Sequence, residues 1–283
     1  MIASFKGGVG KSTVAVNLCV GLAVKKHRVL IIDLDASSGS VDLFMGCEGD
    51  AIYNFFDVIE ERAGIEKAVY QKKGLNYQLD ILKSPASYDL KDLNGLEEKI
   101  SEFTEEAKNI YDFVIFDCPS GKFEIFDYIA KNSDLIFAVT LHSAVSVRSA
   151  EKLAQHLSGL EIKGENVRLI INCFNAGGVA KGYNMGIIDV IERSKIKLIG
   201  LIEQSDLLRD YQELGKTCYD GIGKNYRNRK NNRKLKKLRV FFDDIVGRTL
   251  DENIILKRKY KGIKRTDLYF GKQGGEISEI TDR

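Results

Sequence analysis

The chain has 283 residues, 44% of them hydrophobic and 9% aromatic, which is an ordinary composition for an α/β protein with a buried core. It contains no run of about 18 uncharged apolar residues, which excludes a membrane-spanning helix, and the glycine-rich loop at residue 7 starts too early for a signal peptide. Five scattered cysteines form no Cys-x-x-Cys pair, which argues against disulfides and metal clusters. We therefore expect a cytoplasmic protein with reduced, mostly buried thiols.

Charge is distributed unevenly along the chain. The net charge is +3, but residues 224–265 contain 16 Lys and Arg against 4 Asp and Glu, which leaves −9 on the rest. An acidic body with a basic C-terminal region is a candidate for contact with nucleic acid, anionic lipid or an acidic partner. A solvated run of charge is the competing interpretation.

Short apolar runs alternate with helical patterns from the first residues onward. The predicted strands are Ile2 to Phe5, Val29 to Asp33, Gln78 to Leu82, Phe113 to Asp117, Leu135 to Leu141, Val167 to Cys173 and Leu198 to Ile202. The predicted helices are Ser12 to Lys26, Leu96 to Ala107, Phe123 to Lys131, Ala144 to Leu157, Met185 to Arg193, Leu207 to Leu214 and Arg233 to Leu250. This alternation predicts an α/β fold of three layers, with a doubly wound, mostly parallel sheet covered on both faces.

A polar, basic and glycine-bearing stretch at residues 221–232 is typical of a linker. We therefore expect one nucleotide-binding domain over residues 1–220. Residues 221–283 would form a basic C-terminal helix and tail, either packed on the domain or partly disordered. Leu235, Leu238 and Phe242 begin the apolar face of that last helix, which favours packing over a membrane or partner contact.

A phosphate-binding motif follows the first predicted strand. Gly10, Lys11 and Ser12 end a P-loop, in which backbone N–H groups surround the phosphates, the lysine contacts them and the hydroxyl ligates Mg²⁺. The first glycine of the common pattern is replaced by Phe5, and a second lysine, Lys6, precedes the loop glycines. The predicted helix after the loop directs its positive N-terminus at the anion.

Carboxylates end two of the predicted strands. Asp33 and Asp35 follow one apolar run, and Asp117 ends another just before the turn at Gly121. Because the carboxyl ends of parallel strands share one edge of a sheet, we expect these groups near the P-loop, where they can hold Mg²⁺ and water. Gly121 could turn its N–H toward the γ-phosphate as a switch.

These motifs, with Asn172 at the end of the strand from Arg168, together resemble the MinD/ParA family of dimerising P-loop ATPases over about residues 1–216. The resemblance implies that Lys6 reaches the phosphates of a partner subunit and that Asp35 orients the hydrolytic water. It also implies a catalytic role for Lys11, an adenine contact for Asn172, and a Mg²⁺ site of Ser12, Asp33 and Asp117. The remaining nucleotide contacts that it implies are Gly7, Gly8, Val9, Gly10, Thr13 and Gly121.

By this resemblance the chain is a Mg-dependent ATPase that cycles between a monomer and an ATP-sandwich dimer to position or partition a cellular cargo. Turnover would be slow and stimulated by a partner protein. The basic region 224–265 would dock the protein on non-specific DNA or an anionic membrane, so its location would be cytoplasmic and peripheral at the nucleoid or membrane.

Other functions share these motifs. One is an accessory ATPase of a pilus, secretion or flagellar-placement system, with the same switch and another cargo. An iron-protein-like reductase needs cysteines at a dimer axis, and a tyrosine autokinase usually carries a terminal tyrosine cluster; neither feature is present in the sequence. One departure from the family concerns Gly200 to Asp206, which lacks the proline common there and makes the adenine pocket harder to assign than the phosphate site.

Overall fold

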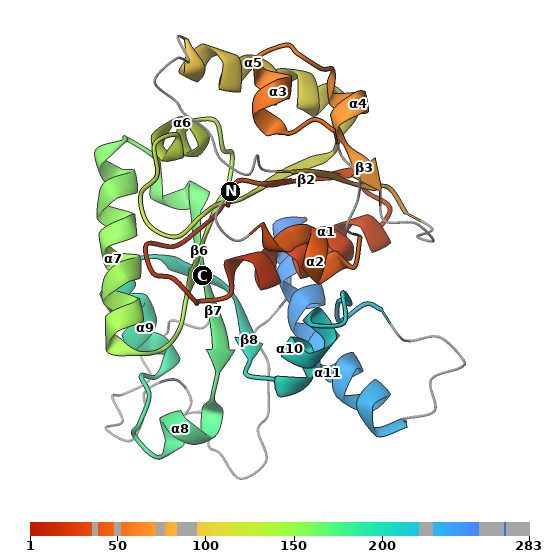
Figure 1. The fold of residues 1–283 in the computed structure, drawn as a ribbon. Helices are drawn as coiled ribbons and strands as arrows, with labels where there is room; N and C mark the ends of the chain where they lie inside the picture. The colour runs from red at the N-terminus through yellow and green to blue at the C-terminus, as the bar shows by residue number, and fades with distance from the viewer. Residues whose placement is uncertain are drawn as a thin grey trace.

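Eight strands form one continuous sheet in the computed structural model, which describes residues 1–35, 39–47, 52–71, 77–83, 95–220, 229–254 and 269 (Figure 1). Their order across the sheet is β3-β4-β2-β5-β1-β6-β7-β8, and every pairing is parallel except that of β3 with β4. The strands are β1 Ile2–Ala3, β2 Val29–Asp33, β3 Tyr70–Gln71, β4 Leu79–Leu82, β5 Phe113–Asp117, β6 Ile136–Thr140, β7 Val167–Phe174 and β8 Lys197–Glu203.

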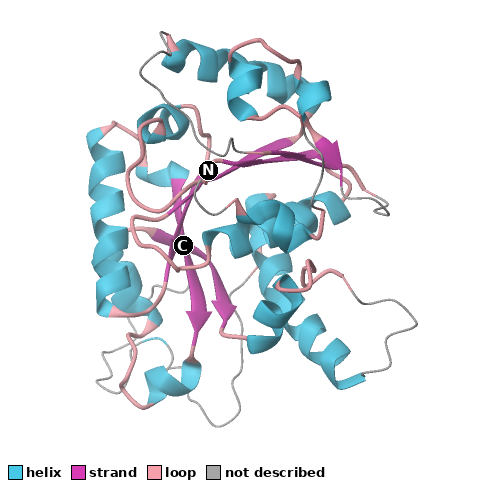
Figure 2. Cartoon of the chain, in the orientation of Figure 1, coloured by secondary structure: helices cyan, strands magenta, loops and turns pink. Residues whose placement is uncertain are grey.

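Helices cover both faces of this sheet (Figure 2), with α1 and α11 on one side and α5, α6, α7 and α9 on the other, as labelled in Figure 1. The α-helices are α1 Lys11–Val24, α2 Ser40–Met45, α3 Phe55–Ile59, α4 Ile65–Ala68, α5 Leu96–Ile110, α6 Phe126–Lys131, α7 Ala144–Gly159, α8 Ala176–Ala180, α9 Ile187–Ser194, α10 Asp206–Gln212 and α11 Arg229–Thr249. A short 3₁₀ helix, Gly164–Asn166, precedes β7. The predicted three-layer, doubly wound α/β fold is confirmed.

Each strand predicted from an apolar run is present, with ends shifted by up to two residues. The run Val29–Asp33 is buried at every position, as expected of a parallel strand covered on both faces. The short antiparallel strand β3 was not predicted, because two residues are too few for a periodic pattern. The helices α2, α3, α4 and α8, of four to six residues, were missed for the same reason.

Helix α1 is buried far more completely than a single apolar stripe predicts. The expected stripe contains Val14, Leu18 and Leu22, yet Ala15, Val16 and Val20 on the other sides are also buried. Contacts with β1, β2 and β5 on one side and with α2 and α11 on others account for the difference. A helix enclosed in this way needs apolar side chains all round.

Helix α11 lies along β8 and α1 (Figure 1). Its residues Leu235, Phe242 and Ile245 are buried, as the sequence predicted for that face. Gly200 in β8 makes the approach possible, because a Cβ at this position would collide with the side chain of Ile245. None of the helices in the described ranges combines the length and the hydrophobicity that a bilayer-spanning segment requires.

The cysteines are free, as expected. Cys19, Cys118 and Cys218 are buried, whereas Cys173 is exposed at the end of β7. Burial raises the pKa of the thiols of Cys19, Cys118 and Cys218, so they stay protonated and unreactive at neutral pH.

Candidate functional site

The glycine-rich loop connects β1 to α1 at the carboxyl edge of the sheet. Gly8 and Gly10 have φ angles of 70° and 86°, in the left-handed region that residues with a Cβ rarely adopt. Gly10 is the N-cap of α1, and α1 carries no acidic side chain in its first turn. The loop therefore presents the free N–H groups and positive end of a helix to an anion.

Lys11 is held back from solvent by a contact that the sequence did not predict. It is 7% exposed, and its Nζ donates a hydrogen bond of 2.7 Å to Oγ of Ser120, in the turn after β5. This bond places the ammonium group between the P-loop and the turn that contains Gly121. A phosphate in the loop would compete with Ser120 for the same group.

Gly121 adopts a φ angle of 88°, so a glycine is required at this turn. Its N–H donates to the backbone carbonyl of Ser4 at 3.0 Å. The suggested switch, in which this N–H turns toward a γ-phosphate, therefore requires that the bond to Ser4 be broken.

Asp33 and Asp117 are direct neighbours, because they are paired in the register between β2 and β5. Burial raises the pKa of Asp33 to about 6, although the N–H groups of Asp35 and Val41 donate to its carboxylate. Burial, together with the charge of Asp33, raises the pKa of Asp117 to about 7, against the opposing effect of Ser12 and Lys11. Two buried carboxylates thus lie side by side, and these N–H groups, Ser12 and Lys11 offset only part of the cost of burying their charge.

Asp117 has unused coordinating capacity. Both of its carboxylate oxygens are buried, and neither meets hydrogen-bond geometry with any residue that the structure describes. Buried carboxylate oxygens without partners are costly unless a cation neutralises them. Together with the Ser12 hydroxyl at the start of α1, the Asp117 oxygens form a set of hard ligands that fits Mg²⁺.

Asp35 lies two residues beyond the end of β2 and is partly exposed. Its N–H donates to Oδ1 of Asp33 at 2.9 Å, and its carbonyl accepts from the N–H of Gly39 at 2.8 Å. These bonds fix its backbone next to the crowded carboxylates. The structure thus brings Asp33, Asp35 and Asp117 together, as the strand ends predicted.

Asn172 is buried against the P-loop. Its Nδ2 donates to the carbonyl of Val9 at 2.8 Å, and its Oδ1 accepts from the N–H of Cys173 at 2.9 Å. A Cβ on Gly10 would collide with the Asn172 amide, which gives a second reason for glycine there. The geometry shows Asn172 supporting the loop, and its adenine contact stays a prediction.

Thr13 and Asn17 connect the P-loop helix to α10 and to the segment that follows it. Thr13 shares hydrogen bonds with Gln212, and Asn17 accepts a bond from the N–H of Cys218. Thr13 and Gln212 are 199 positions apart, so no local motif could have linked them. Gln212 and Ser120 are the residues of this region that the sequence interpretation missed.

Lys6 is half-buried at the entrance of the loop, and its N–H donates to Oγ of Ser4 at 3.2 Å. The preceding ring, Phe5, packs against Phe126 and His156 at centroid distances of 5.5 and 5.7 Å. The Lys6 ammonium makes no hydrogen bond or ion pair with the described residues. Its backbone is therefore anchored while its charge is unused within the described part of the subunit.

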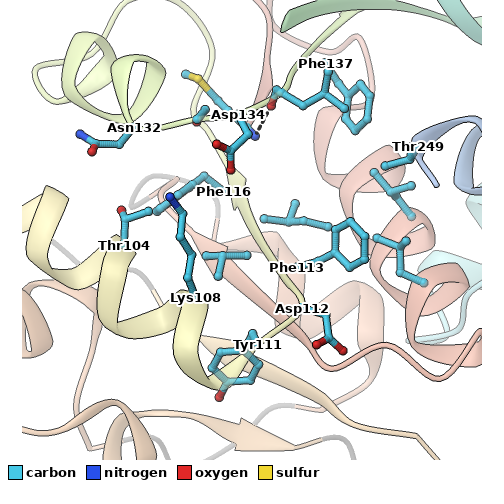
Figure 3. Close-up of a pocket in the computed structure, with 17 residues that line it drawn as sticks. Thr104, Lys108, Tyr111, Asp112, Phe113, Phe116, Asn132, Asp134, Phe137 and Thr249 are labelled. Atoms are coloured by element: carbon cyan, nitrogen blue, oxygen red, sulfur yellow. Dashed lines mark hydrogen bonds between the residues drawn. The ribbon is translucent and has the colours of Figure 1, made fainter. Parts of the chain in front are cut away.

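A cavity of about 300 Å³ lies beside β5, lined by none of the P-loop residues (Figure 3). Asp112 and Phe113, from the amino end of that strand, line it together with Thr104 and Lys108 of α5. The P-loop carboxylates stand at the carboxyl ends of the strands. This cavity is therefore separate from the phosphate site.

Comparisons with known proteins agree with this geometry. Residues 1–171 match the family model described as an AAA domain. The septum site-determining protein MinD of Bacillus subtilis (strain 168) is 30% identical over 209 residues, which cover 73% of this chain and 76% of that protein.

Solved structures show the same fold. The MinC:MinD cell division protein complex of Aquifex aeolicus contains a chain with a TM-score of 0.77 and 27% identity, over 91% of this chain and 97% of that one. MinD of Pyrococcus horikoshii OT3, solved with Mg-ADP, has a TM-score of 0.69 at 20% identity, over 89% of this chain and 98% of that one. With a P-loop preceded by Lys6 and with carboxylates at the ends of β2 and β5, this chain belongs to the MinD/ParA family of P-loop ATPases.

Proposed function

We propose that the protein is a Mg-dependent ATPase that cycles between a monomer and an ATP-sandwich dimer to position a cellular cargo. The observation that carries this proposal is Lys6, whose ammonium stands without a partner in the described part of the subunit, at the entrance of a complete phosphate loop. A cation in this place is suited to the phosphates of a second subunit. Charge that develops on those phosphates would be stabilised only after the two subunits meet.

The residues fit ATP and Mg²⁺. Ser12 and Asp117 would hold the metal, with Asp33 in its water shell, and the bound metal would supply positive charge against the phosphates. The backbone from Gly7 to Gly10 would surround the phosphates. The relative from Pyrococcus horikoshii solved with Mg-ADP has the same fold, which supports this choice of ligand.

Four residues of the site have separate roles in the proposed reaction. Lys11 would leave Ser120 for the phosphates, and Gly121 would release Ser4 to bind the γ-phosphate through its N–H. Asp35 would orient the attacking water. Lys6 would add its positive charge to the nucleotide site of the second subunit. An isolated subunit would therefore hydrolyse ATP slowly, and a different protein that favours the dimer would accelerate hydrolysis.

The oligomeric state with ATP tests this proposal directly. Asp35→Ala should retain ATP binding, lose hydrolysis and accumulate as a dimer in size-exclusion chromatography with light scattering. Lys6→Ala in the same background should remain monomeric, while Lys163→Ala, an exposed lysine between α7 and β7, should still dimerise. A strictly monomeric Asp35→Ala protein at saturating ATP would contradict the dimer cycle.

The names of the relatives point to a first candidate for the cargo. Relatives that are 30% identical over 73–74% of this chain are named septum site-determining proteins, so placement of the division site is the first candidate. Pull-down from the native cell with ATP-bound Asp35→Ala protein as bait would identify the cargo and the stimulating partner. Recovery of pilus, secretion or flagellar components in place of division proteins would change the cargo and leave the switch intact.

The amino-terminal half of α11 offers a basic surface for docking. Its side chains Arg233, Lys234, Lys236 and Lys237 are exposed, while the further basic residues within 221–228 and 255–268 lie outside the described residues. We place the protein in the cytoplasm, bound peripherally to nucleoid DNA or an anionic membrane through these charges. Sedimentation with anionic vesicles and salt-dependent binding to DNA separate the two surfaces.

A further inference from the structure

The third residue of the P-loop helix is attached to a distant buried amide. Oγ1 of Thr13 lies 3.1 Å from Oε1 and 2.9 Å from Nε2 of Gln212, a residue that is 8% exposed at the end of α10. One turn along α1, Nδ2 of Asn17 donates to the carbonyl of Thr13 at 2.8 Å. Oδ1 of Asn17 accepts from the N–H of Cys218 at 2.9 Å. The start of α1 is therefore held to the segment 212–218 by two polar links, one of them buried.

The hydroxyl of Thr13 has one proton to donate and two lone pairs to accept with. Two arrangements fit the geometry with Gln212. In one, Thr13 donates its proton to Oε1, and in the other it accepts a proton from Nε2. Only the second arrangement leaves the Thr13 proton for a phosphate oxygen in the loop, so a bound phosphate selects the orientation in which the Gln212 amide is the donor.

We propose that Gln212 is a positioning residue of the nucleotide site, which acts through Thr13 by donating from Nε2 and directing the hydroxyl proton at the phosphate. The proposal rests on the proposed function, because it requires a phosphate in the loop. Gln212 itself does not touch the reacting atoms. Its contribution is to orient the Thr13 hydroxyl, which would otherwise rotate freely or hydrogen-bond to another group.

The surroundings of Gln212 hold it in place for this task. Three residues later Gly215, with a φ angle of 64°, packs against Gly46 at the end of α2. A Cβ on Gly46 would lie 2.5 Å from the carbonyl oxygen of Gly215, and a Cβ on Gly215 would collide with the Gly46 backbone. At the other end of α10, Oγ of Ser205 accepts from the N–H of Leu208 at 3.3 Å. The helix that carries Gln212 thus packs against α11 and α2, is bonded to α1 through Thr13, and is capped at its start.

Two substitutions of nearly equal size separate positioning from packing. Gln212→Glu can accept from Thr13 but cannot donate, so it competes with the phosphate for the hydroxyl proton. Gln212→Met removes both functions and leaves the Thr13 proton available. We expect Gln212→Glu to weaken the binding of a fluorescent ATP analogue by about tenfold and Gln212→Met by about two- to threefold, since hydrogen bonds to charged groups are the stronger ones.

A double-mutant cycle assigns the effect to Thr13. In a Thr13→Val background the glutamate keeps its charge but has no hydroxyl proton to compete for. The loss of ATP-analogue affinity that Gln212→Glu causes should therefore be several-fold smaller in this background. The melting temperature without nucleotide should change little for Gln212→Glu, because the hydroxyl can still donate to the carboxylate. Gln155→Glu, the same substitution at an exposed position of α7, should leave ATP binding unchanged.

Two results would overturn the inference. One is that Gln212→Glu lowers the affinity for the ATP analogue equally with and without the Thr13 hydroxyl, and the other is that Gln212→Met lowers it more than Gln212→Glu does. Wild-type protein that binds no ATP contradicts the proposed function as a whole. Wild-type protein that binds ATP, with no difference among the Gln212 variants, refutes the role of Gln212 alone.

Discussion

The substitution Asp117→Asn should stabilise the protein while removing its metal. Burial beside Asp33 raises the pKa of Asp117 from 3.8 to about 7, so the folded protein binds this proton more tightly than the unfolded chain. The contribution of Asp117 to the free energy of unfolding therefore falls as pH rises from about 4 to 7 and stays low above that. At about 1.4 kcal/mol per pH unit the full shift is worth roughly 4 kcal/mol, and local entry of water reduces the expected gain at pH 8 to about 1–3 kcal/mol.

Urea denaturation with a metal chelator, at pH 8 and pH 5, measures this gain. Asp112→Asn is the matched control from the other end of β5, because the Arg28 guanidinium lowers the pKa of that exposed carboxyl. The control should be unchanged or slightly less stable at pH 8, the opposite sign. Mg²⁺ with ADP should raise the melting temperature of the wild type but not of Asp117→Asn. Lower stability of Asp117→Asn at pH 8 would show that the buried carboxylate is already compensated, and would refute the reasoning.

Three further predictions concern other contacts. Gly200→Ala places a methyl group against Ile245, so it should lower the free energy of unfolding by about 1–3 kcal/mol in urea titrations; an unchanged value would mean that α11 adjusts freely. Burial lowers the pKa of His142, so the contribution of His142 to stability should fall as pH drops below about 6.5, and the difference in unfolding free energy between the wild type and His142→Gln should change with pH in that range. Ser120→Ala frees the Lys11 ammonium, so the affinity for a fluorescent ATP analogue should rise a few-fold, whereas a loss of affinity would make Ser120 itself a phosphate ligand.

The sequence predicted the parts of the site that lie next to one another along the chain or at the ends of strands. Asp33 and Asp117 could be placed together because parallel pairing puts the ends of apolar runs at one edge, and β2 and β5 pair with these two residues in register. The loop from Gly7 to Ser12 was identifiable because its chemistry is contained in a contiguous motif.

What the sequence could not predict depends on side chains that meet across the fold. Ser120 reaches Lys11 over 109 positions, and Gln212 reaches Thr13 over 199, in each case from a turn or helix end with no periodic pattern. Asn172 was identified as a site residue, but its bond to the Val9 carbonyl depends on how closely β7 approaches the loop. That distance cannot be predicted from the spacing of residues in the sequence. Tertiary distance, and not residue type, was the missing information.

The two moving parts of the proposed switch converge on Ser4, a buried residue between β1 and the loop. Its hydroxyl oxygen accepts from the N–H of Lys6 and its carbonyl accepts from the N–H of Gly121. If Gly121 turns toward a γ-phosphate, the Ser4 carbonyl loses its partner, and a buried carbonyl without a hydrogen bond costs free energy until the local backbone adjusts. That adjustment takes place two residues from Lys6. A nucleotide that moves Gly121 would therefore also bias Lys6, the lysine proposed to reach the partner subunit, and this would couple phosphate sensing to dimer formation within one short segment.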